Sequence, residues 1–205
     1  FPAAFLAMSL VSCGGAETTE AGTTDSTSTT EATTEVAAPA VKDYTYFSGK
    51  LDVFEIAGVT LTKDLVNDNP SNEDLRRSWT TDPVAAGCDK IQINTYSLSR
   101  SGNNRESLEH KSLQEFEEAT LANLGEGKTA AEFKEYVVDD SLAFYYCTLT
   151  GCEESFGKTD FNQIYITHFS ANVGFNIWVS VYDKTMDMTK ANDIAIKVMD
   201  YIAKP

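Results

Sequence analysis

The chain has 205 residues, of which 16 are basic and 31 acidic, and its formal net charge is −15 at pH 7. Residues 1–40 contain five of the acids and no base, so residues 41–205 keep 16 basic against 26 acidic residues. This balance excludes a nucleic-acid-binding protein, which needs clustered Lys and Arg facing phosphate, and it disfavours docking on anionic lipid headgroups.

The chain begins with an apolar run, residues 1–11, that is interrupted only by Ser9. Eleven residues are about half of the roughly 20 that a membrane-spanning helix needs, but they fit the apolar region of a secretory signal. No initiator Met or basic segment precedes the run, so we expect the front of the signal to be missing. We interpret residues 1–12 as a signal peptide. This peptide either ends in a motif that uses Cys13 or is an ordinary signal peptide in which Cys13 has no role.

The end of this run, Leu10-Val11-Ser12-Cys13, resembles the lipobox of bacterial lipoproteins. The resemblance implies that Cys13 is acylated on sulfur and becomes the new N-terminus after cleavage. Two or three acyl chains hold a protein on a membrane, whereas one chain gives marginal binding. We therefore expect the protein to be anchored to the membrane through the acylated Cys13, on the outer face of the cytoplasmic membrane in the bacterial cell envelope.

A low-complexity segment, residues 13–40, follows the predicted anchor. From Gly14 to Ala40 it contains nine Thr, two Ser and five acidic residues, with Val36 as the one sizeable apolar side chain. Such a composition buries too little apolar surface to offset the entropy of ordering. We interpret the segment as a disordered tether with a reach on the order of 30 Å. Residues 41–205 then form a single globular domain.

The first half of this domain predicts short elements. Residues 51–56 and 59–61 read as two strands around a turn at Ala57 and Gly58. Ser71, three residues before Asp74, predicts the N-cap of a short helix that ends near residue 79. The stretch "CDKIQINTYSL", residues 88–98, is rich in β-formers and alternates polar with apolar residues, which predicts a strand.

The second half predicts two longer helices and two hairpins. Residues 107–124 have a helical period that ends at a candidate cap, Gly125. The sequence "EYVVDDSLAFYYCTL" predicts a hairpin that turns at Asp139 and Asp140. The stretches "QIYITHFS" and "FNIWVSVYD" predict a second hairpin, and residues 187–203 predict an amphipathic closing helix. This order indicates an α+β fold with a mainly antiparallel sheet flanked by two longer helices.

The same succession of elements resembles the PsbP-like fold, which is named for an extrinsic subunit of photosystem II. The resemblance covers roughly residues 90–205 and is carried by "IQINTYS", "YVVDDSLAFYY", "IYITHF" and "FNIWVSVYD" in this order. It implies an accessory or binding module without catalytic chemistry of its own.

Candidate cofactor and metal motifs do not fit their templates. "GEGKT", residues 125–129, matches the end of a phosphate-binding loop, but Ala122 stands where the first Gly is required and a helix precedes it. "NDNPSNED", residues 67–74, lacks the Gly and the bidentate Glu of an EF-hand loop. The chain has two His and no CxxC. The sequence predicts no cofactor, no metal site and no catalytic residue.

One cluster of side chains is a candidate binding face. If Ala171 pairs with Phe175 across the second hairpin, His168 lies opposite Trp178. Ile166 and Tyr182 then share its face of the sheet. Under a helix this set is ordinary core. Left open, it is an aromatic patch that could bind a partner or an apolar ligand.

Three cysteines remain after Cys13. An extended chain would hold Cys147 and Cys152 roughly 16 Å apart, but a turn at Thr150 and Gly151 would bring them within disulfide distance. We expect a Cys147–Cys152 disulfide, with Cys88 as a buried thiol. Pairing of Cys88 with either of the other two is the alternative.

The resulting hypothesis is a membrane-tethered lipoprotein that acts as a non-enzymatic binding or accessory module for other envelope proteins. A small-ligand-binding lipoprotein is the alternative. A cell-envelope hydrolase that uses acids such as Asp139, Asp140, Glu153 and Glu154 is less favoured, because paired acids in turns are common on protein surfaces.

Overall fold

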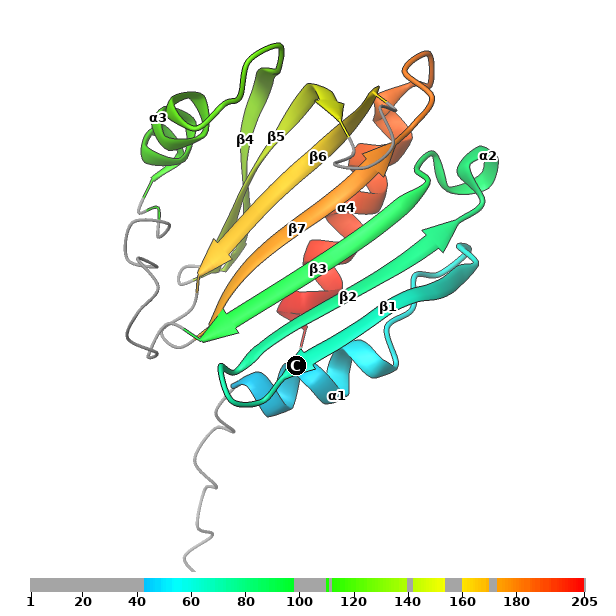
Figure 1. Cartoon of the computed structure of the whole chain (residues 1–205), viewed down its shortest axis with the longest axis vertical. Coiled ribbons are helices and arrows are strands. Elements are labelled where there is room, and N and C mark those ends of the chain that lie inside the picture. The colour runs from blue at the N-terminus through cyan, green and yellow to red at the C-terminus, as the bar shows by residue number, and fades with distance from the viewer. Residues whose placement is uncertain are drawn as a thin grey trace, which may run out of the picture. The chain divides into compact units, whose positions relative to one another are not determined.

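A seven-stranded antiparallel sheet with the strand order β1-β2-β3-β7-β6-β5-β4 forms the centre of the fold (Figure 1). The computed structural model describes residues 43–97, 110, 112–139, 142–153, 160–169 and 173–204. The predicted signal peptide, Cys13 and the predicted tether lie outside these residues. The strands are β1 (Leu61–Asn69), β2 (Asp74–Thr81), β3 (Lys90–Ser97), β4 (Thr129–Asp139), β5 (Leu142–Glu153), β6 (Asp160–Phe169) and β7 (Val173–Val181).

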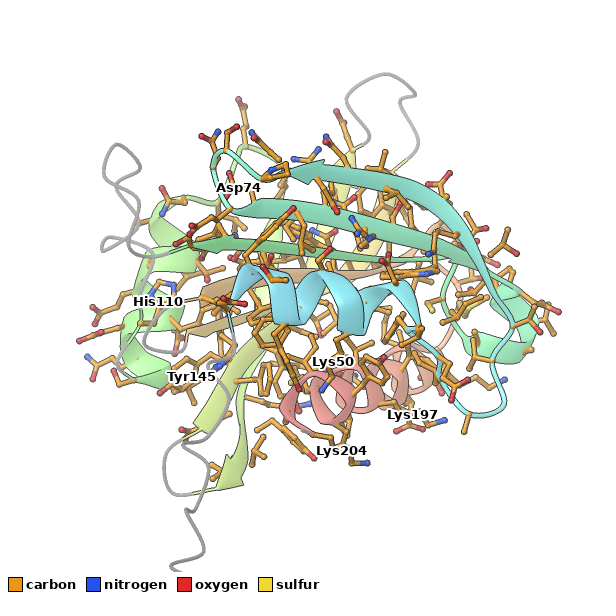
Figure 2. All side chains as sticks on the ribbon, turned by 90° about the horizontal axis from the view of Figure 1, so that it is seen from below. Lys50, Asp74, His110, Tyr145, Lys197 and Lys204 are labelled. Carbon is orange, nitrogen blue, oxygen red and sulfur yellow. The ribbon has the colours of Figure 1, made fainter. Side chains whose placement is uncertain are left out.

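The described helices are α1 (Tyr44–Asp52), α2 (Pro83–Ala86), α3 (Leu113–Ala122) and α4 (Met188–Ala203). On one face of the sheet, α1 packs against β2 and β3, and α4 packs against β6 and β7. Figure 2 shows the sheet as one layer and these two helices as a second layer below it. Helix α3 packs beside β4 at one end of the sheet. The α+β class is confirmed, with four described helices in place of the two longer helices and one short helix expected.

The main core lies between the sheet and the helix pair α1 and α4. Alternate residues of the central strands point into it, among them Ile93 of β3 and Ile177 of β7, both fully buried. The apolar stripe predicted for the closing helix is buried against them: Ala191, Ala195, Val198 and Ile202. Each fully buried large side chain contributes about 1.5–3 kcal/mol, so this layer dominates the stability of the fold.

A smaller core lies on the opposite face of the sheet, under α3. Phe116 of α3 is fully buried and contacts the rings of Tyr145 and Tyr165 at centroid distances of 6.1 and 5.9 Å. Cys147, Leu149 and Cys152 of β5 complete this cluster. Helix α3 therefore closes the β4 end of the face that α1 and α4 leave uncovered.

A buried arginine joins α1 to the first hairpin. The Arg77 side chain is 1% exposed and donates to both carboxylate oxygens of Asp68, with the Nη2 to Oδ2 distance at 2.9 Å. It also lies 3.3 Å from the Asp52 carboxylate at the end of α1. This guanidinium lowers the pKa of Asp68 through its hydrogen bond. A buried charge is tolerated here because both of its partners are carboxylates.

The prediction of a helix ending near residue 79 is wrong. The segment is strand β2, joined to β1 by a turn in which the Asn72 and Glu73 amides donate to the carbonyls of Asn69 and Pro70 at 3.1 and 3.3 Å. Leu75, Arg77 and Trp79 alternate into the core. The alternation of buried and exposed residues along β2 was not recognised in the sequence, because Arg77 lies on the buried face and a charged residue is expected to face solvent.

The prediction of a strand at residues 51–56 is also wrong, because Leu51 and Asp52 form the end of helix α1. The Asp43 side chain caps this helix by accepting from the Tyr46 amide at 3.1 Å, and Phe47 and Leu51 are buried four residues apart. Lys50 donates to the Ile202 carbonyl at the end of α4 (Figure 2). The turn predicted at Ala57 and Gly58 is confirmed by an Ile56–Val59 bridge.

The other predicted elements are present with adjusted limits. β3, the two hairpins β4–β5 and β6–β7, and α4 are confirmed. The helix predicted for residues 107–124 begins at Leu113, after the N-cap Ser112, and residues 107–109 lie outside the described part. It ends at Ala122, and its C-cap is Asn123 and not Gly125, because the Asn123 amide closes the last turn on the Ala119 carbonyl.

Candidate functional site

The register of the second hairpin separates the four residues of the predicted binding face. His168 pairs with Phe175, and Trp178 pairs with Tyr165, so the shift from the predicted register is three residues. Because an odd shift exchanges the two faces of a strand, His168 and Trp178 point to opposite sides of the sheet. Ile166 and His168 face α1 and α4, whereas Trp178 and Tyr182 face away from them. The predicted patch therefore does not exist as one surface.

His168 belongs to the core. It is 5% exposed, its Nδ1 lies 3.0 Å from the Ala143 carbonyl oxygen, and its ring lies 4.5 Å from that of Phe144 and 6.0 Å from that of Phe175. Burial lowers the pKa of His168 to about 4, so the imidazole is neutral at neutral pH. Its place among aromatic rings makes it a packing residue.

The predicted Cys147–Cys152 disulfide is not formed, and Cys88, Cys147 and Cys152 are all free and buried. The expected turn at Thr150 and Gly151 is instead a bulge inside β5, with Gly151 at φ +70° and pairing to β6 resuming at Cys152. The strand therefore continues between the two cysteines. Burial raises the pKa of Cys88 to about 11 and that of Cys147 to about 12, so these thiols are poor nucleophiles.

The face away from α1 and α4 carries a cluster that we call the amide–aromatic platform, defined by Gln92 and Asn94 of β3, Asn176 and Trp178 of β7, and Tyr165 of β6. Cross-strand pairing arranges these residues in two neighbouring rows. Gln92 pairs with Trp178 and Trp178 with Tyr165, while Asn94 pairs with Asn176. All five are half-buried. Figure 1 views the sheet from this side, with α4 passing behind β7.

Hydrogen bonds inside the platform fix part of its amide groups. The Gln92 Nε2 donates to Asn94 Oδ1 at 3.2 Å, and the Tyr165 hydroxyl donates to Asn176 Oδ1 at 3.1 Å. The Asn94 and Asn176 Nδ2 groups and the Gln92 Oε1 have no further hydrogen bond to the described residues. Two donors and one acceptor are therefore oriented and still available to a ligand.

The aromatic part of the platform rests on the smaller core. The rings of Trp178 and Tyr165 lie 5.9 Å apart at an interplanar angle of 26°, and Tyr165 lies 5.9 Å from Phe116 under α3. Burial raises the pKa of Tyr165 to about 12, so its hydroxyl stays protonated and continues to donate to Asn176. The Trp178 ring is thus held by packing on one side and half-buried.

Two cationic side chains stand at the margin of the platform, and one of them, Lys90, is paired. Lys90 Nζ lies 3.0 Å from the Asp64 carboxylate, which also accepts from the Ser78 hydroxyl at 3.1 Å. These contacts lower the pKa of Asp64, the hydrogen bond from Lys90 having the largest effect. Arg76, which pairs with Asn94, is the charged neighbour on the second row. The five platform residues themselves are uncharged.

A cavity of about 430 Å³ lies elsewhere, where β4 and β5 meet the start of α4. Its walls combine carboxylates with apolar groups such as Tyr146, Met188 and Ile196. Two of its carboxylates are engaged within the protein, since Asp187 caps α4 through the Thr189 amide and Glu132 pairs with Lys134 at 3.3 Å. Asp193 is the third carboxylate in the wall. The cavity lacks the rows of amides and aromatic rings on neighbouring strands that define the platform.

Of the four candidate catalytic acids, Glu153 is the one whose side chain the structure describes. Glu153 lies exposed at the end of β5, while Asp140, Glu154 and the side chain of Asp139 lie outside the description. In the described ranges no three His, Cys, Asp or Glu side chains form a possible metal site. None of the helices described there has the length and apolar character of a membrane span.

The sequence pattern singled out Trp178 but not the three amides that surround it. The signal was present in "IQINTYS" and "FNIWVSV", where apolar residues alternate with Gln92, Asn94, Asn176 and Trp178. Alternation predicts that these four lie on one side of their strands. Only the order β3-β7-β6, which the sequence does not reveal, shows that they meet.

Models of known protein families give no match to this chain. The curated proteins give none either.

Proposed function

We propose that this protein is a lipid-anchored, non-enzymatic binding module of the bacterial cell envelope, and that it binds another envelope component through the amide–aromatic platform. The observation that carries the proposal is a sheet face on which oriented amides and a rigid indole remain available, while the opposite face is filled by α1 and α4. These amides are half-buried and lie beside an aromatic ring, so a ligand can reach them without opening the core.

The lipobox resemblance at Cys13 and the tether composition support the location on the outer face of the cytoplasmic membrane. The tether would let the platform reach components on the order of 30 Å from the bilayer. We also propose that the domain is PsbP-like. The antiparallel strands and the terminal helix α4 support this proposal. An accessory role agrees with a platform that carries no paired acids.

The test uses the full-length chain in detergent micelles and envelope fragments of a Gram-positive and a Gram-negative bacterium, with sedimentation of the bound protein. We expect the wild-type chain to sediment with one type of envelope. The triple variant Asn94→Ala, Asn176→Ala, Trp178→Ala should remain in the supernatant. Asn192→Ala, which removes an amide from α4 on the other side of the sheet, should behave as the wild type.

Retention of the triple variant at the wild-type level would contradict the proposed role of the platform. A separate measurement addresses the anchor. Cys13→Ser should abolish incorporation of radiolabelled palmitate and release the protein from membranes, whereas unchanged labelling would contradict acylation at Cys13.

A second candidate partner follows from the same surface. Another envelope protein is the partner that the sequence predicts, and Trp and Tyr are enriched at the centres of protein interfaces. Digestion of the envelope fragments with protease distinguishes this partner, because binding to a protein would then be lost.

A further inference from the structure

We infer that the platform binds an uncharged polysaccharide chain of the envelope. The inference rests on the proposed function, of which it names the ligand class. It starts from the first row, in which β3, β7 and β6 place Gln92, Trp178 and Tyr165 at steps of about 5 Å across the sheet. A linear chain of sugar rings laid across the strands meets these side chains one after another.

The first row supplies the apolar contact. A sugar ring presents a face of C–H groups, and an aromatic ring is a rigid, flat partner for it that also tolerates neighbouring polar groups. Trp178 occupies the middle of the row, between Gln92 and Tyr165. Because Tyr165 packs against Phe116 and against the indole, Trp178 cannot collapse into the smaller core and remains in position for a ligand.

The amides supply the polar contacts. A hydroxyl group both donates and accepts, so a saccharide needs donors and acceptors interspersed around its rings. The available Nδ2 groups of Asn94 and Asn176 and the available Oε1 of Gln92 provide this mixture. Their orientation is set by the hydrogen bonds to Asn94 Oδ1 and Asn176 Oδ1, which reduces the entropy lost on binding.

The charge of the platform selects against other polymers. Its five residues are uncharged, Lys90 at its margin is paired with Asp64, and the exposed Arg76 beside Asn94 is a single cation. A nucleic acid or a polyanionic glycan would need several Lys or Arg side chains at the contact. An apolar chain would leave three amides buried without partners, at a cost of about 1–3 kcal/mol each. A neutral polyhydroxylated chain matches both properties.

The experiment uses the full-length chain in detergent micelles and envelope fragments that are untreated, protease-digested or oxidised with periodate, which destroys sugar diols. We expect sedimentation with untreated and protease-digested fragments and loss of binding after periodate. Loss after protease would identify a protein partner and overturn the inference, while the proposed function would stand. Failure to bind any fragments would overturn both.

A second experiment monitors ligand binding directly through the fluorescence of the Trp178 indole. Uncharged hexasaccharides of glucose, mannose and N-acetylglucosamine are titrated into the chain while Trp178 fluorescence is recorded in a Trp79→Phe background. We expect at least one to shift the emission saturably, with an affinity that does not change between low and high salt. The Asn94→Ala and Asn176→Ala variants should each bind the hexasaccharide with about tenfold lower affinity, which corresponds to about 1.4 kcal/mol. Asn192→Ala should leave it unchanged. No response to any of the three hexasaccharides, or a steep salt dependence, would overturn the inference.

Discussion

The two faces of strands β3, β6 and β7 are built from alternate residues of the same segments, yet they differ in every respect. Toward α1 and α4 lie Ile93, Ile166, Phe175 and Ile177, all fully buried. Toward the other side lie the amides and aromatic rings of the platform, which are half-buried and in part have no hydrogen-bond partner in the part of the chain that the structure describes. Alternation lets one strand supply stability on one face while the other face remains open for recognition.

The largest expected effect is on the helix-covered face. Phe175→Ala removes a fully buried ring that lies 4.7 Å from the Phe47 ring of α1. We expect the free energy of unfolding to fall by about 3–5 kcal/mol, as for other buried aromatic truncations. Chemical denaturation followed by circular dichroism measures it. A loss below about 1 kcal/mol would show that this face is not the structural one.

The second effect is a pH dependence from His168. Its pKa is about 4 in the folded protein against 6.5 in the unfolded chain, so the unfolded state binds the proton first as the pH falls. Stability is therefore complete above pH 6.5 and is lost on acidification toward pH 4. Between pH 6.5 and pH 4 the free energy of unfolding of the wild type should fall by about 2–3 kcal/mol more than that of His168→Phe. Parallel stability–pH curves for the two proteins would contradict a buried neutral imidazole.

A pair of carboxylates on β1 sharpens the comparison. Asp68 holds the buried Arg77, whereas Asp64 pairs with Lys90, whose side chain is 30% exposed. Asp68→Asn should lower the free energy of unfolding by about 2 kcal/mol, because it leaves a buried guanidinium with weaker partners. Asp64→Asn should cost less than about 1 kcal/mol. Thermal unfolding of both variants tests this, and equal losses would count against the distinction.

The smallest expected effect on stability is on the platform. Asn94→Ala and Asn176→Ala each remove a half-buried amide without opening the core, so the free energy of unfolding should change by about 0.5 kcal/mol or less. Binding to envelope fragments should nevertheless fall. If either variant is destabilised by more than about 2 kcal/mol, the amides are needed for stability, and the two faces do not have separate structural and binding roles.

Much of the fold could be predicted because the patterns were local. The stripe of α4 and the hairpins β4–β5 and β6–β7 follow from periodicity and turn residues within one segment. Residues 71–79 were read as a helix because Ser71 imitates an N-cap and Arg77 points inward. The reason for a buried arginine lies in Asp68 and Asp52, which are close in space but appear in the sequence as unrelated acids.

The candidate site was harder to predict than the fold. Trp178 stands out in the sequence, but its neighbours depend on a register and a strand order set by long-range pairing. A three-residue difference in the β6–β7 register was enough to exchange His168 for Tyr165 as its partner. The cysteine prediction failed for a similar reason, since the bulge at Gly151 bends β5 without reversing it.

The chain has two tryptophans, one on each face, and they allow the most direct test of the comparison. Trp79 is 2% exposed in the main core, and Trp178 is half-buried in the platform. Acrylamide quenching of the single-tryptophan variants Trp178→Phe and Trp79→Phe measures each separately. We predict that Trp79 is shielded with and without envelope fragments, and that Trp178 is quenched in the free protein and protected once fragments are bound. A Trp178 that is equally quenched in both conditions would contradict the division of the sheet into a structural face and a binding face.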